Sequence, residues 1–485
     1  MKSTGLLGGV QVFYILMSVV RNKLTALLIG AAGMGLADLY CRTLELLGNT
    51  TNFGIAFSAI RRLSALHDEG YYHEIAYYIR LIRTWTFLTA LFGAVVCIAL
   101  SPLISLLTTG SYAHALDYCF LAPAVAFTTL AGGEMAVLKG MRRLKWLALT
   151  SAASALGTVV IAVPLYAAFG MKGILPVIAG TTALNFLLNL YASSRQFPYR
   201  ISPHRNHFLR QGGHLIKLGS AYIAAGIAAS AAELFIRTII VGSDSNYRMA
   251  GLYAAGLTLT VSYARLIFVA MDADYFPRLS ASLNRRKTMN DTINQQIDIL
   301  VLLMAPFLLC FAMMLPLIVP LLYSRHFMEI IPMILCALPY MFFKAIYSPI
   351  AYLPLASGKS KLYLFAELTY YVGFSIAVSL GYHFGGLTGA GIGLSLANLT
   401  DLLLLPLLYR RIFHFHFQRA TLHRCALQGL FLLCGLGCCA ITSPASLPST
   451  AIFLLLSAAY SWHFLKQNTA ILSKMNKLLH RKNKG

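Results

Sequence analysis

Long stretches without a charged side chain are the feature that most restricts how this chain can fold. Six of them contain no Asp, Glu, Lys or Arg, at residues 84–116, 146–171, 173–194, 299–324, 368–400 and 425–465. A helix of about 20 apolar residues crosses the hydrocarbon layer of a membrane. Open strands leave their backbone groups unsatisfied in lipid, so these stretches predict an all-α polytopic membrane protein. The composition, 58% hydrophobic and 11% charged, argues against a water-soluble enzyme.

Taking every apolar run in order predicts 14 transmembrane helices. The run 425–465 is too long for one crossing and contains the turn-rich segment 442–450, so it is divided into two helices. The predicted spans are 6–29, 35–59, 84–107, 115–138, 147–168, 174–194, 217–241, 250–271, 298–323, 330–353, 363–384, 388–408, 425–441 and 450–465.

The basic residues between these spans predict the orientation of the chain. With the N-terminus in the cytoplasm, cytoplasmic segments hold 30 of the 39 Lys and Arg residues when Lys217, the first residue of its predicted span, is counted with them, and the outer loops hold only Lys172, Arg248 and Arg325. This bias is the one that the positive-inside rule requires. It places both termini in the cytoplasm and accounts for the net charge of +23 without a nucleic-acid partner.

Two short matches at one offset indicate an internal duplication. Gly35-Leu36 recurs 216 residues later as Gly251-Leu252, and the tetrapeptide that begins at Arg62 recurs at Arg278. Six predicted helices separate the copies, so both copies have the same orientation. The prediction is therefore two six-helix lobes, residues 1–216 and 217–424, followed by 425–485 with two C-terminal helices and a basic cytoplasmic tail.

Chemistry that would need a catalytic or metal site is not expected. Seven of the nine cysteines lie in apolar runs and no CxxC pair occurs, so we interpret the cysteines as reduced packing residues. The pair His414 and His416 lies in the basic segment 410–419, which we interpret as an interfacial helix rather than a metal site. No nucleophile–base pair or nucleotide fingerprint appears, so no cofactor is predicted.

Two segments resemble a known family. Residues 8–36 and 251–281, the latter with ADYFPRLS at 273–280, resemble the bacterial O-antigen and oligosaccharide translocases. These polysaccharide transporters belong to the multidrug/oligosaccharidyl-lipid/polysaccharide exporter superfamily. The resemblance implies a flippase of the bacterial inner membrane that moves an undecaprenyl-diphosphate-linked oligosaccharide, a unit of O-antigen lipopolysaccharide or of a related surface polysaccharide. Its expected partners are this substrate, membrane lipid, a coupling proton or sodium ion, and polysaccharide polymerase machinery.

Ionisable side chains within the predicted spans need a reason, because each costs about 2.5–3.5 kcal/mol on insertion scales. A diphosphate headgroup crossing the membrane needs cations, and the guanidinium fork of Arg suits phosphate. We therefore predict a cationic substrate cavity used by alternating access. The candidate substrate-binding residues are Arg21, Lys23, Arg42, Arg237, Arg265 and Lys344.

Structural roles for the same cations stay open. Glu233 and Arg237 are four residues apart and can pair, and Asp38, Arg42 and Glu45 share one helix face. One of Arg21 and Lys23 can extend toward the headgroups, since the two are about 200° apart on a helix. Glu45 and Glu233 are the candidates for binding a coupling ion, with a permanent salt bridge as the alternative.

Two other functions are weighed against the flippase. A cation-coupled multidrug antiporter of the same superfamily would be expected to carry acidic rather than basic groups in its cavity. A membrane enzyme that polymerises or ligates glycans would be expected to have long outer loops, and the predicted outer loops are short. The sequence therefore favours a transporter of an anionic cargo.

Overall fold

The computed structural model describes residues 2–69, 71–201, 208–243, 246–262, 265–441 and 446–482, almost all of them helical. The chain divides into two compact units. Unit 1 comprises residues 1–254 with 320–327, and unit 2 comprises 255–319 with 328–485. The predicted lobe boundaries after residues 216 and 424 stay predictions.

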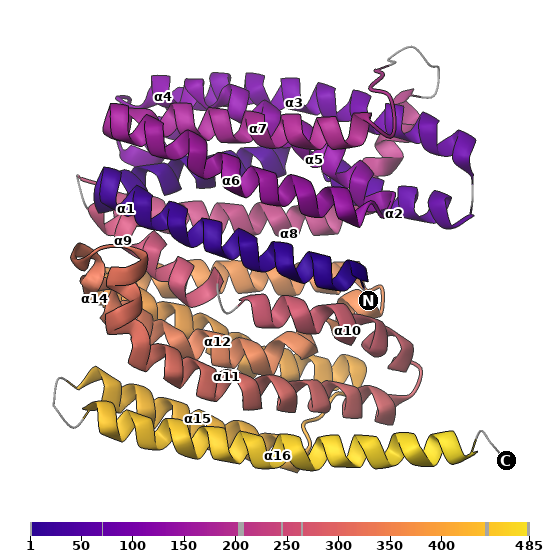
Figure 1. Ribbon diagram of the computed structural model, residues 1–485, viewed down its shortest axis with the longest axis vertical. Coiled ribbons are helices and arrows are strands. Elements are labelled where there is room, and N and C mark those ends of the chain that lie inside the picture. Colours follow the sequence, from indigo (N-terminus) through magenta and orange to yellow (C-terminus); the bar gives the residue numbers. More distant parts are fainter. Residues whose placement is uncertain are drawn as a thin grey trace. The chain divides into compact units, whose positions relative to one another are not determined.

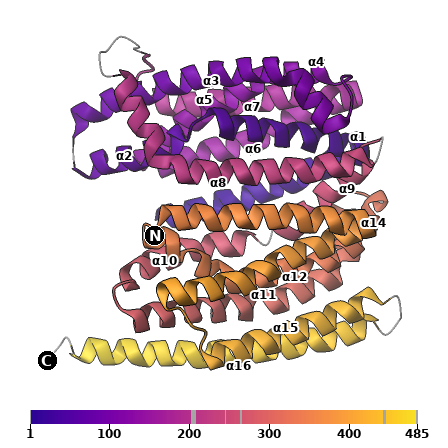
Figure 2. The same ribbon diagram turned by 180° about the vertical axis from the view of Figure 1, so that it is seen from behind.

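Unit 1 is built from long antiparallel helices (Figures 1 and 2). In it, α1 packs against α6 and α8, while α5 packs against α2, α3 and α7. Its helices are α1 (Lys2–Thr51), α2 (Ile55–Glu69), α3 (Tyr72–Thr109), α4 (Ala115–Phe120), α5 (Ala122–Gly140), α6 (Leu144–Phe169), α7 (Ile174–Ser194), α8 (Phe208–Gly242) and the start of α9 (Arg248–Leu257).

Unit 2 holds the remaining helices, among which α12 and α14 pack together, as do α15 and α16. Polar side chains of α14 bond to backbone carbonyls of α12: Ser395 Oγ donates to Cys336 (2.6 Å) and Asn398 Nδ2 to Tyr340 (2.9 Å). The helices are the rest of α9, α10 (Arg265–Ser282), most of α11 (Arg286–Leu322), α12 (Ile331–Ala351), α13 (Leu353–Ala356), α14 (Ser360–Phe413), α15 (Arg419–Ala440) and α16 (Ser446–Lys482).

Within the described residues, nine helical segments are long and apolar enough to cross a membrane, so the chain is a multi-pass membrane protein. Three of the nine, at 13–51, 144–194 and 360–413, are 39–54 residues long. Each is longer than one crossing needs, and each contains a glycine with positive φ: Gly30, Gly170 and Gly386. The helix class is confirmed, while the count of 14 stays a prediction.

The glycines that suggested a duplication lie in contact within unit 1. A Cβ on Gly35 would collide with the carbonyl oxygen of Tyr247, and one on Gly251 would collide with that of Ala31. The second half of α1 and the start of α9 therefore cross at residues related by the 216-residue offset. Leu63 and Leu279, one in each copy of the repeated tetrapeptide, are both fully buried. The internal duplication itself stays a prediction.

The predicted interfacial helix at 410–419 is wrong. Helix α14 ends at Phe413, His414 has a left-handed backbone conformation, and residues 414–418 form no helix before α15 begins. Asn290 and Asn294 of α11 cause this, because their side-chain oxygens accept the backbone N–H groups of His416 (2.9 Å) and Gln418 (3.0 Å). Two asparagines one helical turn apart thus satisfy backbone N–H groups of the linker, so these groups have hydrogen-bond partners although the linker is not helical.

Candidate functional site

Five ionisable side chains meet between the second half of α1 and α8, and we call them the α1–α8 ionic cluster: Asp38, Arg42, Glu45, Glu233 and Arg237. Arg42 Nε donates to Asp38 (3.4 Å) and Nη1 donates to Glu45 (3.0 Å). Arg237 Nε donates to the other oxygen of Asp38. Arg237 Nη1 donates to both the carbonyl and the carboxylate of Glu233.

Helical spacing explains this arrangement. Asp38, Arg42 and Glu45 follow one another at intervals of four and three, so they share one face of α1. Glu233 and Arg237 are one turn apart on α8, which packs against α1. Asp38 receives an arginine from each helix and is therefore the bridge of the cluster. The pairings weighed from the sequence are observed, but the sequence did not reveal that Asp38 joins them.

The two arginines of the cluster differ in how deeply they are buried. The Arg237 side chain is 1% exposed, and its guanidinium lies 5.6 Å from the Tyr253 ring centroid. Arg42 is 33% exposed and Glu45 is 50% exposed. Arg237 is therefore enclosed by protein, whereas the pair of Arg42 and Glu45 is within reach of another molecule. With all groups ionised, three carboxylates face two guanidinium groups, so the cluster carries one excess negative charge.

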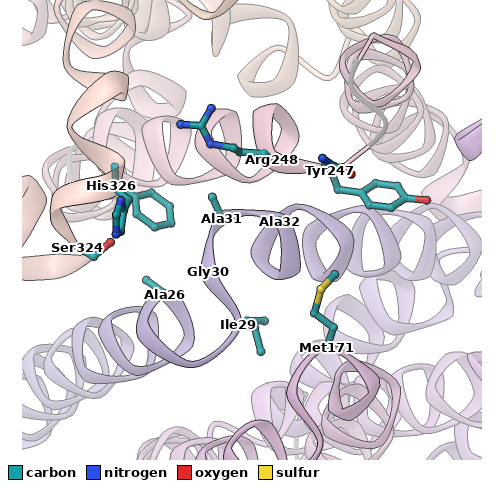
Figure 3. Close-up of a pocket in the computed structure, with 12 residues that line it drawn as sticks. Ala26, Ile29, Gly30, Ala31, Ala32, Met171, Tyr247, Arg248, Ser324 and His326 are labelled. Atoms are coloured by element: carbon teal, nitrogen blue, oxygen red, sulfur yellow. The ribbon is translucent and has the colours of Figure 1, made fainter.

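A pocket of about 610 Å³ lies at the break in α1, within unit 1 (Figure 3). Gly30 has φ 65° and ψ −172°, so the helix stops there and restarts at Ala31. Figure 3 shows Arg248 and His326 on the rim above this break, with Tyr247 beside the restarted helix. The pocket therefore combines backbone of α1 with polar side chains of two predicted outer loops, Asn246, Tyr247, Arg248, Ser324 and His326.

Within the described part of unit 1, Arg21 and Lys23 have partners outside the α1–α8 ionic cluster. Lys23 Nζ donates to the carbonyl of Pro320 (2.6 Å), and Arg21 Nη2 donates to the side chain of its neighbour Asn22 (3.3 Å). In unit 2, Lys344 of α12 lies 5.8 Å from the Phe268 ring and 5.9 Å from the Tyr340 ring. The side chain of Arg265 lies outside the described residues. One cavity shared by all six cations stays a prediction.

A further intramembrane arginine, Arg83, was missed because the predicted span began one residue after it. Arg83 of α3 donates from Nε and Nη2 to the two oxygens of Glu134 on α5, both at 2.9 Å. It also donates to Ser193 (2.8 Å) and to the carbonyls of Phe197 and Pro198. A buried acidic residue in an apolar helix was the available signal, since Glu134 requires a buried cation.

Comparisons with known proteins are consistent with this architecture. The model of a family described as polysaccharide biosynthesis protein matches residues 72–332. No curated protein shows significant sequence similarity to the chain.

Among solved structures, the lipid II flippase MurJ in an inward closed conformation is similar with a TM-score of 0.72 and 15% identity, over 96% of this chain and 99% of that one. An inward-facing multidrug resistance MATE transporter of the MOP superfamily is similar with a TM-score of 0.66 and 14% identity, over 83% of this chain and 94% of that one. A Vibrio cholerae MATE transporter is similar with a TM-score of 0.57 and 12% identity, over 85% of this chain and 98% of that one. The chain therefore has the fold of transporters and flippases, not of an enzyme.

Proposed function

The chain belongs to the polysaccharide biosynthesis protein family, and we propose that it is a flippase for a lipid-diphosphate-linked oligosaccharide. The proposed substrate is an undecaprenyl-diphosphate-linked unit of O-antigen or of a related surface polysaccharide. Transport would run across the bacterial inner membrane by alternating access. The family match and the fold confirm the resemblance seen in residues 8–36 and 251–281. The cargo and the mechanism belong to the proposal.

The half-exposed pairing of Arg42 is the observation that carries this proposal. Arg42 lies within a membrane-spanning segment, yet a third of its side chain is exposed and its partners are carboxylates on its own helix. A diphosphate presents the same kind of oxygen atoms as a carboxylate, with more charge. It can therefore replace Glu45 on the Arg42 guanidinium without leaving a cation unpaired in the membrane.

Replacement of a carboxylate also supplies a route to ion coupling. Once a phosphate takes Arg42, Glu45 loses its cation and becomes a better binder of a proton or sodium ion. The same holds for Glu233 if Arg237 is drawn toward the substrate, although Arg237 is enclosed and bonded to Asp38 as well. We therefore place substrate exchange at Arg42, and coupling at Glu45 before Glu233. Arg237 is assigned to holding Asp38 in place.

Reconstitution tests the proposal. The purified protein is placed in liposomes with an undecaprenyl-diphosphate-linked oligosaccharide that carries a fluorescent sugar, and arrival in the opposite leaflet is followed with a membrane-impermeant quencher. We expect transport by the parent chain, none by Arg42→Gln, and parent-level transport by Arg142→Gln. The Arg142 control removes an arginine paired with Asp68, both more than half exposed. Folded protein that moves no labelled lipid defeats the proposal.

A cation-coupled multidrug antiporter is the second candidate, and one observation favours it. The α1–α8 ionic cluster holds one more carboxylate than guanidinium groups, which suits a cationic cargo better than the sequence suggested. The same liposomes loaded with a fluorescent cationic dye separate the two functions. Dye movement driven by a proton or sodium gradient, together with a stationary glycan lipid, would establish the antiporter.

A further inference from the structure

Tyr247 has a backbone conformation that is unusual for a bulky residue. Its φ is +59°, in the left-handed region that aromatic side chains rarely adopt. Its carbonyl oxygen faces Gly35 so closely that no side chain fits there. Such conformations persist only where surrounding contacts hold them, and they gather at switch regions. The contacts that hold Tyr247 are therefore worth tracing.

The Tyr247 side chain ends in a hydrogen-bonded network. Its hydroxyl bonds to Nε2 of His114 at 2.8 Å, and His114 Nδ1 bonds to Asp117 at 2.7 Å. Tyr40 of α1 donates its hydroxyl to the same oxygen of Asp117 at 2.8 Å. A neutral imidazole that donates from Nδ1 to a carboxylate presents Nε2 as an acceptor, so the Tyr247 hydroxyl can donate to it.

This network joins three parts of unit 1 that are distant in the sequence. Tyr40 lies on α1, His114 immediately precedes α4, and Tyr247 immediately precedes α9. By the predicted topology, Tyr247 and His114 belong to two outer loops. Tyr247 also lines the pocket at the break in α1, and its ring points away from Gly30 alongside the restarted helix (Figure 3). Movement of α9 away from α1 would break the Tyr247–His114 bond and the contact with Gly35 together.

We propose that Tyr247 acts as a latch between α1 and α9: the hydrogen bond between its hydroxyl and His114 keeps these two helices in contact. The hydroxyl bond holds a backbone conformation that would otherwise relax, so loss of this bond frees α9 to separate from α1. Glycines at positions 35 and 251 let the two helices close without a gap. In the proposed function this event opens the outer pocket for release of the headgroup, and only that biological role rests on the proposed function.

Cysteine accessibility tests the latch. Ala250, next to the crossing on α9, is 1% exposed, so Ala250→Cys reports separation of the helices. The full chain is placed in right-side-out vesicles and labelled with a membrane-impermeant maleimide, and the parent chain supplies the background of the native cysteines. We expect Tyr247→Phe to raise the labelling rate of Cys at this position about five-fold, the change in equilibrium expected for one ordinary hydrogen bond.

Two further variants keep the test decisive. Tyr112→Phe removes a hydroxyl from the same outer loop as His114, from a side chain that is 64% exposed, and should leave labelling unchanged. His114→Ala should raise labelling, and its combination with Tyr247→Phe should add nothing beyond the larger single effect. The latch is overturned if Tyr247→Phe labels at the parent rate, or if the two substitutions multiply. Because labelling needs no substrate, the latch can stand even if glycan transport is not found.

Discussion

Two arginine–carboxylate clusters lie inside unit 1, and they differ in how fully the protein satisfies them. Arg83 and Glu134 are 1% and 3% exposed, and serine and backbone partners complete a bidentate pair. In the α1–α8 ionic cluster, exposure runs from 1% at Arg237 to 50% at Glu45, and carboxylates outnumber arginines. The first cluster joins α3, α5 and the end of α7. The second leaves charge accessible beside α1.

The difference separates charges that can exchange partners with a ligand from charges that cannot. An enclosed ion pair whose hydrogen-bond partners all come from the protein has no partner to exchange with a ligand. Removal of one member of the pair leaves the other charge buried and unpaired. A pair with a carboxylate in excess and an exposed member can trade partners with a ligand. We therefore propose a structural role for Arg83 and a substrate-binding role for Arg42, and four substitutions test this distinction.

The largest expected effect is on Arg83. Arg83→Met leaves Glu134 buried without its cation and should lower the free energy of unfolding by about 3–5 kcal/mol. Unfolding is measured in mixed detergent and SDS micelles. The double variant Arg83→Met, Glu134→Gln should recover part of the loss, because no ion is then buried alone. A loss under about 1 kcal/mol for the single variant would remove the contrast with Arg42.

The next largest loss in the free energy of unfolding is expected for a substitution at Asp38. Asp38→Asn keeps the shape but removes the charge that bridges Arg42 and Arg237, leaving the enclosed Arg237 with Glu233 alone. We expect a loss of about 1–3 kcal/mol, the cost of weakening a hydrogen bond to a buried charged group. The same unfolding measurement applies, with Glu45→Gln as the matched carboxylate on the exposed side. Equal losses for both variants would contradict the bridging role.

Arg42 should show a small effect on stability and a large one on transport. A half-exposed ion pair contributes about 0–1 kcal/mol, so Arg42→Gln should unfold nearly as the parent does. Its transport of labelled lipid-linked oligosaccharide should nevertheless fall below detection. Arg42→Lys keeps the charge but loses the fork, and we expect it to restore only part of the rate. Full transport by the Gln variant would show that Arg42 does not bind the diphosphate.

The smallest expected effect on stability is at the surface pair of Arg142 and Asp68. Both side chains are more than half exposed, at 2.7 Å separation. Arg142→Gln should change the free energy of unfolding by at most about 0.5 kcal/mol and leave transport intact. If this variant matched Arg83→Met, the measured losses would reflect general damage rather than burial.

Much of the fold followed from the sequence, because lipid allows few solutions. Charge-free stretches predicted the helices, whereas the repeated dipeptides at positions 35 and 251 predicted a duplication and not the helix crossing at which these glycines lie. Spacing along one helix also predicted the pairings of Arg42 with Asp38 and Glu45, and of Arg237 with Glu233. Contacts within one helix depend on its period alone, so a sequence reveals them.

Contacts between helices were harder to predict. The sequence did not indicate that Asp38 would receive Arg237, or that Arg83 would meet Glu134. The segment 410–419 looked helical because its basic and aromatic residues suit a membrane surface. Its central part is not helical, and two asparagines of α11 accept the backbone N–H groups that a helix would otherwise satisfy.

The sequence by itself determined that the chain is a multi-pass helical membrane protein, because uncharged stretches of this length are stable only where backbone groups bond internally. It also indicated most of the residues that carry charge into the membrane, although Arg83 lay one residue outside its predicted span. Only the tertiary structure decided which charges are enclosed and which remain accessible. That outcome depends on which helix faces meet, and helix packing brings together side chains as distant in sequence as Asp38 and Arg237.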